Sequence, residues 1–195
     1  MAAPSIPGRR FRGPGSTWKP PARQPGQPRV LVTLGTIFSD RALLDEVVGA
    51  VASTGATVIA TVGMAMKEET TAAPPVTHPE SVHFVQFAPM DQLLSGVDLV
   101  VSAGGAGTVL AAMSRAVPLV LWPQGADQPI NAARAEAAGV ASVVDTAAAL
   151  PGAVTEALQD TALRAAAATA AHQIAALPVP AEVLDEIVTL STAAD

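Results

Sequence analysis

Two loops of this chain carry residues whose types and spacing suit binding chemistry. The first is the turn Gly104-Gly105-Ala106-Gly107-Thr108, which follows an apolar run and opens a helical pattern. The first amides of a helix lack internal acceptors and lie at the positive end of its dipole. Because glycines let a backbone approach an anion closely and Thr108 adds a hydroxyl, the turn suits a phosphate or diphosphate. A tight strand-to-helix turn that needs glycine for geometry alone would account for it equally well.

The second loop follows the next apolar run and contains Asp127 and Gln128. A carboxylate beside an amide, which both donates and accepts, can bind vicinal hydroxyls. The alternative is that Asp127 caps the following helix, and the two roles can coexist. Asn131, in the first turn of that helix, is a candidate structural residue. Together the two loops predict a site for a phosphate-linked sugar.

Other kinds of site lack their signatures. There is neither a P-loop Gly-Lys-Ser/Thr nor a G-x-G-x-x-G after the first strand, which argues against nucleoside triphosphates and NAD. The chain has no cysteine, so it has no thiolate nucleophile or zinc-thiolate site. His78, His83 and His172 show no metal-binding spacing and form no Ser/His/Asp set. Thr36, after the first strand, is a weaker candidate for a second hydroxyl donor to phosphate.

The elements that must position these loops alternate regularly. Apolar runs predict strands at 30–34, 57–62, 82–87, 99–102, 119–122 and 141–144. Helical patterns are predicted at 39–53, 89–94, 107–116, 128–138, 147–176 and 181–190. This alternation implies right-handed βαβ units, and therefore an α/β, Rossmann-like parallel sheet of about six strands with helices on both faces. Ligands of such sheets bind beyond the carboxyl ends of the strands, where both loops lie.

Residues 1–28 differ in composition from the domain predicted over 29–195. They contain seven prolines and four glycines, which is typical of an interdomain linker. Residues 1–29 hold six of the eleven lysines and arginines and no acidic residue. A nucleic-acid-binding arm is the less favoured interpretation because the segment is short and proline-rich and the remaining chain is acidic. No apolar run approaches the ~20 residues of a membrane span, and no hydrophobic stretch follows the N-terminal arginines, so we expect no membrane span and a cytoplasmic location.

The order of these motifs resembles the C-terminal, donor-binding half of GT-B glycosyltransferases. More narrowly, the chain resembles the UDP-glucuronosyltransferase-like family that includes bacterial antibiotic glycosyltransferases. The resemblance covers almost the whole chain. Two stretches match named family motifs: AGGAGT at 103–108 corresponds to His-Gly-Gly-x-Gly-Thr, and DQPINA at 127–132 corresponds to Asp-Gln-x-x-Asn-Ala. Three further stretches resemble other parts of the family: PRVLVTLGT at 28–36, VQFAPMDQLL at 85–94 and the linker-like RFRGPGSTW at 10–18.

The resemblance implies a role for each motif. Thr36 and the loop from Gly104 to Thr108 would hold the diphosphate, Phe87 and the backbone near Ala88 the nucleobase, and Asp127 and Gln128 the sugar. The family usually takes dTDP- or UDP-sugars without a metal or other cofactor. The implied reaction is inverting transfer of the sugar to a small-molecule acceptor such as a polyketide.

Two departures from the family pattern affect the expected activity. Ala103 stands where the family places a histidine that donates to the leaving phosphate. The acceptor half, which carries the catalytic base in this family and packs against the terminal helix, has no counterpart in the sequence, so no catalytic residue is expected in this chain. Three hypotheses follow: a donor-binding piece of a longer enzyme that transfers nothing alone, a natural subunit of a two-chain glycosyltransferase, or a catalytically dead binding or regulatory relative.

Overall fold

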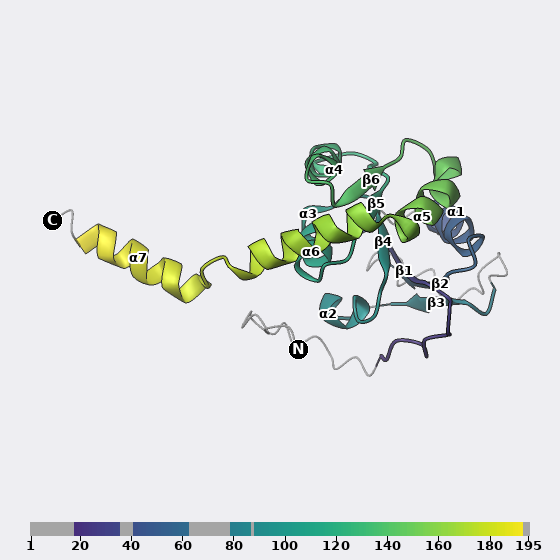
Figure 1. Cartoon of the computed structure of the whole chain (residues 1–195), viewed down its shortest axis with the longest axis horizontal. Helices are drawn as coiled ribbons and strands as arrows, with labels where there is room; N and C mark the ends of the chain where they lie inside the picture. The colour runs from purple at the N-terminus through teal and green to yellow at the C-terminus, as the bar shows by residue number, and fades with distance from the viewer. Residues whose placement is uncertain (1–17, 36–40, 63–78, 87, 193–195) are drawn as a thin grey trace.

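A six-stranded parallel sheet forms the centre of the molecule (Figure 1). The computed structural model describes residues 18–35, 41–62, 79–86 and 88–192. The strand order is β3-β2-β1-β4-β5-β6. The strands are β1 (Arg29–Thr33), β2 (Thr57–Thr61), β3 (Val82–Val85), β4 (Leu99–Ser102), β5 (Leu119–Leu121) and β6 (Ala141–Val143).

The central strands β1, β2 and β4 are buried along almost their whole length. Leu31, Ile59 and Leu99 are fully buried, as expected for a parallel sheet that is covered on both faces. β1 pairs with β2 on one side and with β4 on the other, so the strand order reverses at β1. In sheets of this kind, the carboxyl ends of the strands at such a reversal border the ligand crevice.

Helices cover both faces of the sheet. One face packs against α1 (Arg41–Ala52) and α5 (Leu150–Gln159), and the other against α2 (Met90–Leu93), α3 (Ala106–Ser114) and α4 (Gln128–Ala137). α6 (Thr161–Ala175) passes from one layer to the other, because its Leu163 packs in the first core and its Ala170 in the second (Figure 1). The predicted α/β, Rossmann-like architecture is confirmed.

The helical region predicted at 147–176 is divided. A 3₁₀ turn (Ala147–Ala149) leads into α5, and the chain becomes extended at Asp160, with φ −72° and ψ 108°. The Asp160 carboxylate accepts hydrogen bonds from the amides of Ala162 and Leu163 at 2.7 and 3.0 Å. Helix propensity alone gave no reason for a break in this alanine-rich run; the cap at Asp160 starts a separate helix.

The described part of the predicted linker, residues 18–28, has neither helix nor strand. It is bonded to residues at the amino edge of the sheet. The Arg23 guanidinium donates to both Asp98 carboxylate oxygens, at 2.6 and 2.8 Å. Asp98 Oδ2 also accepts from the Arg29 amide at 2.8 Å, and Arg29 Nη2 donates to the Pro21 carbonyl at 2.5 Å. These bonds join the segment to the starts of β1 and β4.

The terminal helix α7 (Pro180–Thr192) extends away from the sheet (Figure 1). The side chains of Val183, Leu184 and Ile187 are 39%, 60% and 57% exposed. Among the described residues, no side chains cover this apolar face of α7. No helix among the described residues has the length and hydrophobicity to cross a bilayer.

Candidate donor-binding site

The glycine-rich turn lies at the carboxyl end of β4, and Gly104 is fixed on both sides. Its amide donates to Ser102 Oγ at 3.2 Å, and its carbonyl accepts from Asn131 Nδ2 at 3.1 Å. Its φ is +90°, and a Cβ there would lie 3.3 Å from the Gln128 carbonyl oxygen. Gly104 is therefore needed for the geometry of the turn, and its amide is already occupied.

The next three amides are available for a ligand. Among the described residues, the amides of Gly105, Ala106 and Gly107 have no hydrogen-bond acceptor, whereas those of Thr108 and Val109 donate to the Gly105 carbonyl. Ala106 and Gly107 are exposed. The three free donors form the first turn of α3, at the positive end of its dipole. This arrangement can bind an anionic group such as a diphosphate.

The structure also separates the two explanations for the glycines. Gly105 has a φ of −61°, and Gly107 likewise lies outside the left-handed region. A Cβ added at either residue would meet nothing within 4 Å. Local geometry therefore accounts for Gly104 but not for Gly105 or Gly107, where an added Cβ would stand in open space.

Ala103, the residue at the family's histidine position, is not directed into solvent. It is 1% exposed and packs in the same core as Val101 and Leu34. A larger side chain at this position would have to displace these neighbours or turn out of the core. Within the described residues, the free donors of the loop are thus backbone amides and the Thr108 hydroxyl.

Gln128 shapes the second loop from inside. It is 6% exposed, and its Oε1 accepts from the amides of Gln124 and Gly125 at 2.9 and 3.2 Å. From the sequence alone, this amide is expected both to donate to and to accept from sugar hydroxyls. The structure uses its oxygen for the loop and leaves Nε2 without a partner among the described residues.

Asp127 is exposed at the start of α4, yet its carboxylate makes no capping bond to the helix amides. Its Oδ2 instead accepts from Asn131 Nδ2 at 2.7 Å. The alternative role as a helix cap is therefore wrong for this side chain. The same Asn131 nitrogen reaches the Gly104 carbonyl, so the two predicted loops are directly connected. The structural role expected for Asn131 is confirmed, although its link to the first loop is not visible in the sequence.

The nucleobase candidates are described only in part. Phe87 and Thr36 lie outside the described residues. Ala88 is 6% exposed and packs beside Leu93 in the core on the α3 side, so only its backbone is suited to contact a base. Sequence reasoning missed Ser102, whose hydroxyl fixes the start of the glycine turn; its position as the last residue of β4 was the available signal.

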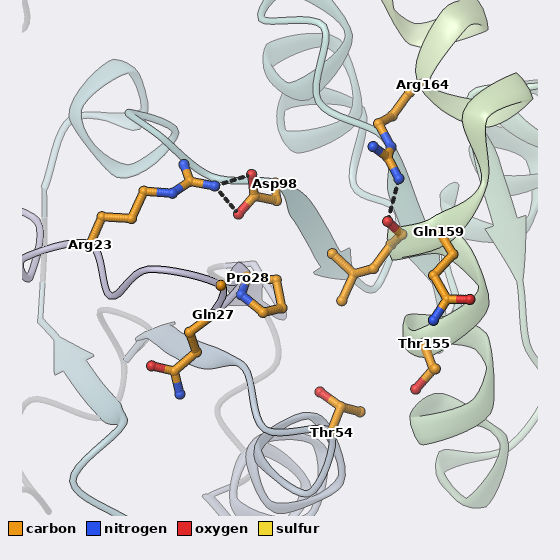
Figure 2. Close-up of a pocket in the computed structure, with 10 residues that line it drawn as sticks. Arg23, Gln27, Pro28, Thr54, Asp98, Thr155, Gln159 and Arg164 are labelled. Atoms are coloured by element: carbon orange, nitrogen blue, oxygen red, sulfur yellow. Dashed lines mark hydrogen bonds and ion pairs between the residues drawn. The ribbon is translucent and has the colours of Figure 1, made fainter.

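A pocket of about 460 Å³ lies at the opposite, amino edge of the sheet (Figure 2). Figure 2 shows Arg23 directed at Asp98, and Arg164 directed at the end of α5, where it donates to the Leu158 carbonyl. Thr155 and Gln159 line the α5 side. Since its cations already have partners, and ligands of such sheets bind at the carboxyl edge, we do not assign the donor to this pocket. The described residues contain no group of histidine and acidic side chains suited to a metal ion.

Comparison with known proteins agrees with this geometry. Residues 45–190 match the family described as erythromycin biosynthesis protein CIII-like, C-terminal domain. Tylactone mycaminosyltransferase of Streptomyces fradiae is 32% identical over 178 residues, covering 87% of this chain and 38% of that protein. The crystal structure of glycosyltransferase SnogD from Streptomyces nogalater has 30% identity and a TM-score of 0.71, over 90% of this chain and 46% of SnogD.

Glycosyltransferase VinC, whose structure was determined in complex with dTDP, has 28% identity and a TM-score of 0.69 over 88% of this chain and 43% of VinC. The curated relatives are longer proteins, and the chain spans between 10% and 41% of their length. The matched family covers most of this chain, and the fold is one half of the GT-B architecture. The chain therefore belongs to the family of erythromycin biosynthesis protein CIII-like C-terminal domains, which are glycosyltransferase domains.

Proposed function

We propose that this chain binds the donor of an inverting glycosyltransferase, a nucleoside diphosphate sugar such as a dTDP- or UDP-sugar. The observation that carries the proposal is the set of three unpaired amides at Gly105, Ala106 and Gly107, two of them on glycines that the fold does not require. Such donors, with the helix dipole, would hold the diphosphate and stabilise the departing nucleoside diphosphate during transfer. No metal is part of the proposal.

The second loop would hold the sugar. Asp127 retains an exposed carboxylate, and the Gln128 Nε2 is unpaired among the described residues. One acceptor and one donor side by side fit two neighbouring hydroxyls. We propose that Phe87 and the backbone near Ala88 hold the base, with Thr36 as a further phosphate donor. Relatives support this arrangement, because VinC binds dTDP and the curated relatives transfer sugars.

Transfer to an acceptor requires a second wall for the cleft. We propose that an acceptor half, on the same polypeptide or on a separate chain, supplies the catalytic base and a pocket for a small molecule such as a polyketide. The exposed face of α7, with Leu184 and Ile187, would pack against it. The chain alone would then bind the donor and transfer nothing.

Calorimetric titration tests donor binding. We expect saturable binding of dTDP or UDP and of dTDP-glucose or UDP-glucose, and no detectable binding of thymidine or uridine, because the diphosphate contributes the charge-assisted hydrogen bonds. A folded chain that binds none of these diphosphates would refute the proposal. Equal affinity for the nucleosides would refute the assignment of the glycine loop.

A separate assay addresses catalysis. Sugar transfer from the bound donor to a polyketide acceptor should be undetectable with this chain alone and should appear when an acceptor half is added. Transfer by the isolated chain would show that the base is not confined to the acceptor half. Donor binding without transfer in every such mixture would favour the catalytically dead relative.

A further inference from the structure

We propose that Asn131 is a positioning residue that fixes the diphosphate loop and the sugar-binding carboxylate relative to each other. The inference rests on the proposed donor site and assigns one side chain to both of its halves. Asn131 lies on α4 and need not touch the ligand. It acts through Gly104 on one side and Asp127 on the other.

The hydrogen bonds of Asn131 Nδ2 support this role. The nitrogen lies 3.1 Å from the Gly104 carbonyl oxygen and 2.7 Å from Asp127 Oδ2. A side-chain amide nitrogen carries two hydrogens, so both bonds form at once. The Asn131 backbone amide also donates to the Asp127 carbonyl at 3.1 Å, so the two residues lie one turn apart at the start of α4. Aspartate at this position has the same shape but no donor.

The bond to Gly104 determines the direction of a ligand-binding amide. The Gly104 carbonyl and the Gly105 N–H belong to one planar trans peptide unit, so they point in opposite directions. Because the carbonyl is held toward Asn131 on α4, the Gly105 N–H points away from that helix. The Gly104 amide is bonded to Ser102 Oγ, so the peptide units on both sides of Gly104 are held.

The bond to Asp127 orients the carboxylate. Its Oδ2 is engaged by Asn131, which leaves Oδ1 for a sugar hydroxyl. Asn131 is therefore expected to affect both the affinity for the nucleoside diphosphate and the additional affinity contributed by the sugar. Asp127 is expected to affect only the sugar contribution. The comparison of Asn131 with Asp127 therefore distinguishes a residue that couples the two loops from a residue that serves only one of them.

Calorimetry on four single variants and one double variant of the whole chain tests the inference. With dTDP or UDP, whichever the wild type binds, Asn131→Ala should raise Kd about fivefold, the value of one lost hydrogen bond, and Asn131→Asp should raise it at least as much. Asp127→Ala should leave this Kd unchanged. Glu136→Ala, an exposed residue of the same helix, is the control and should also leave it unchanged.

The contribution of the sugar to binding is measured as the ratio of the Kd for the nucleoside diphosphate to the Kd for its glucose derivative. General destabilisation of the domain would not change this ratio. Asn131→Ala and Asp127→Ala should each lower this ratio, and the double variant should lower it no further, because Asn131 acts on the sugar through Asp127. Unchanged dTDP and UDP affinity in Asn131→Ala, or additive losses in the double variant, would overturn the inference.

Amide hydrogen exchange of the unliganded chain tests the role of Asn131 separately from the proposed donor binding. Asn131→Ala should speed exchange at Gly104, Thr108 and Val109, whose amides are bonded in the turn, relative to the wild type and Glu136→Ala. A wild type that binds no diphosphate defeats the proposed function. Faster exchange in that case would still support Asn131 as the residue that holds the loop, and unchanged exchange would overturn the inference.

Discussion

Replacing Gly107 with alanine should make the domain more stable and a poorer ligand binder. Gly107 lies in the first turn of α3 with helical backbone, and a Cβ there would meet nothing within 4 Å. Alanine at such a position restricts the unfolded chain and favours helix, so we expect a gain of about 0.5–1 kcal/mol in the free energy of unfolding. The methyl group would project into open space in the same turn as the three free amides.

The loss of affinity follows from the bonds that this methyl group would hinder. A hydrogen bond from a backbone amide to a charged oxygen is worth about 1.5–3 kcal/mol, so hindering one should raise the Kd for dTDP or UDP at least tenfold. Gly104→Ala should have the opposite effect on stability. Because Gly104 has a φ of +90° and an added Cβ would lie 3.3 Å from the Gln128 carbonyl oxygen, this variant should lose about 1–3 kcal/mol of the free energy of unfolding.

Urea unfolding of the wild type and both variants gives the stabilities, and calorimetry gives the affinities. In Gly107→Ala, the free energy of unfolding should rise while the affinity for dTDP or UDP falls. A Gly107→Ala domain that is destabilised by more than about 1 kcal/mol would show that the fold itself needs this glycine. A stable variant that binds dTDP and UDP as well as the wild type would remove the loop from the ligand site.

Three further predictions concern residues with defined contacts. Asp160→Ala should lower the free energy of unfolding by about 1 kcal/mol in urea titrations, because the cap of α6 is lost; no change would mean that α6 is held by packing alone. Asp98→Ala should lower the free energy of unfolding by about 1–3 kcal/mol in the same titrations, because it leaves the part-buried Arg29 amide without an acceptor. Asp98→Asn, which keeps an oxygen acceptor, should recover part of this loss. Gln128→Ala should lower both the stability of the domain and its affinity for the sugar nucleotide, whereas Asp127→Ala should lower only the affinity. Thermal unfolding measures the stability and titration the affinity. Equal losses of stability in the two variants would contradict the buried role of Gln128.

The sheet could be predicted from the sequence because its signal is local. Buried parallel strands are continuous apolar runs, and β4 (Leu99–Ser102) was predicted with its observed bounds. The break at Asp160 could not be predicted from propensity, since alanine-rich sequence on both sides favours a continuous helix. There a side-chain cap decides the local structure, and its acceptor geometry exists only once the chain has turned.

The site was predictable in its residue types but not in its bonding. Glycine, aspartate and glutamine at these spacings indicated an anion loop and a hydroxyl-binding loop. Which groups remain free depends on contacts between distant segments: the Asn131 bond to Gly104 spans 27 positions in the chain, and the Gln128 oxygen is used by the loop backbone. A pattern gives the donors and acceptors that are present, whereas the fold determines which of them stay unpaired.

The most direct test of the proposed donor site is an NMR titration of the ¹⁵N-labelled chain with dTDP and UDP. We expect saturable shift changes that are largest at the amides of Gly105, Ala106 and Gly107, because these donors have no partner among the described residues of the unliganded domain. Residues at the amino edge, such as Gly26 and Thr155, should not respond. Shift changes centred on that edge, or no shift change in the glycine loop at saturating nucleotide, would contradict the proposed donor site.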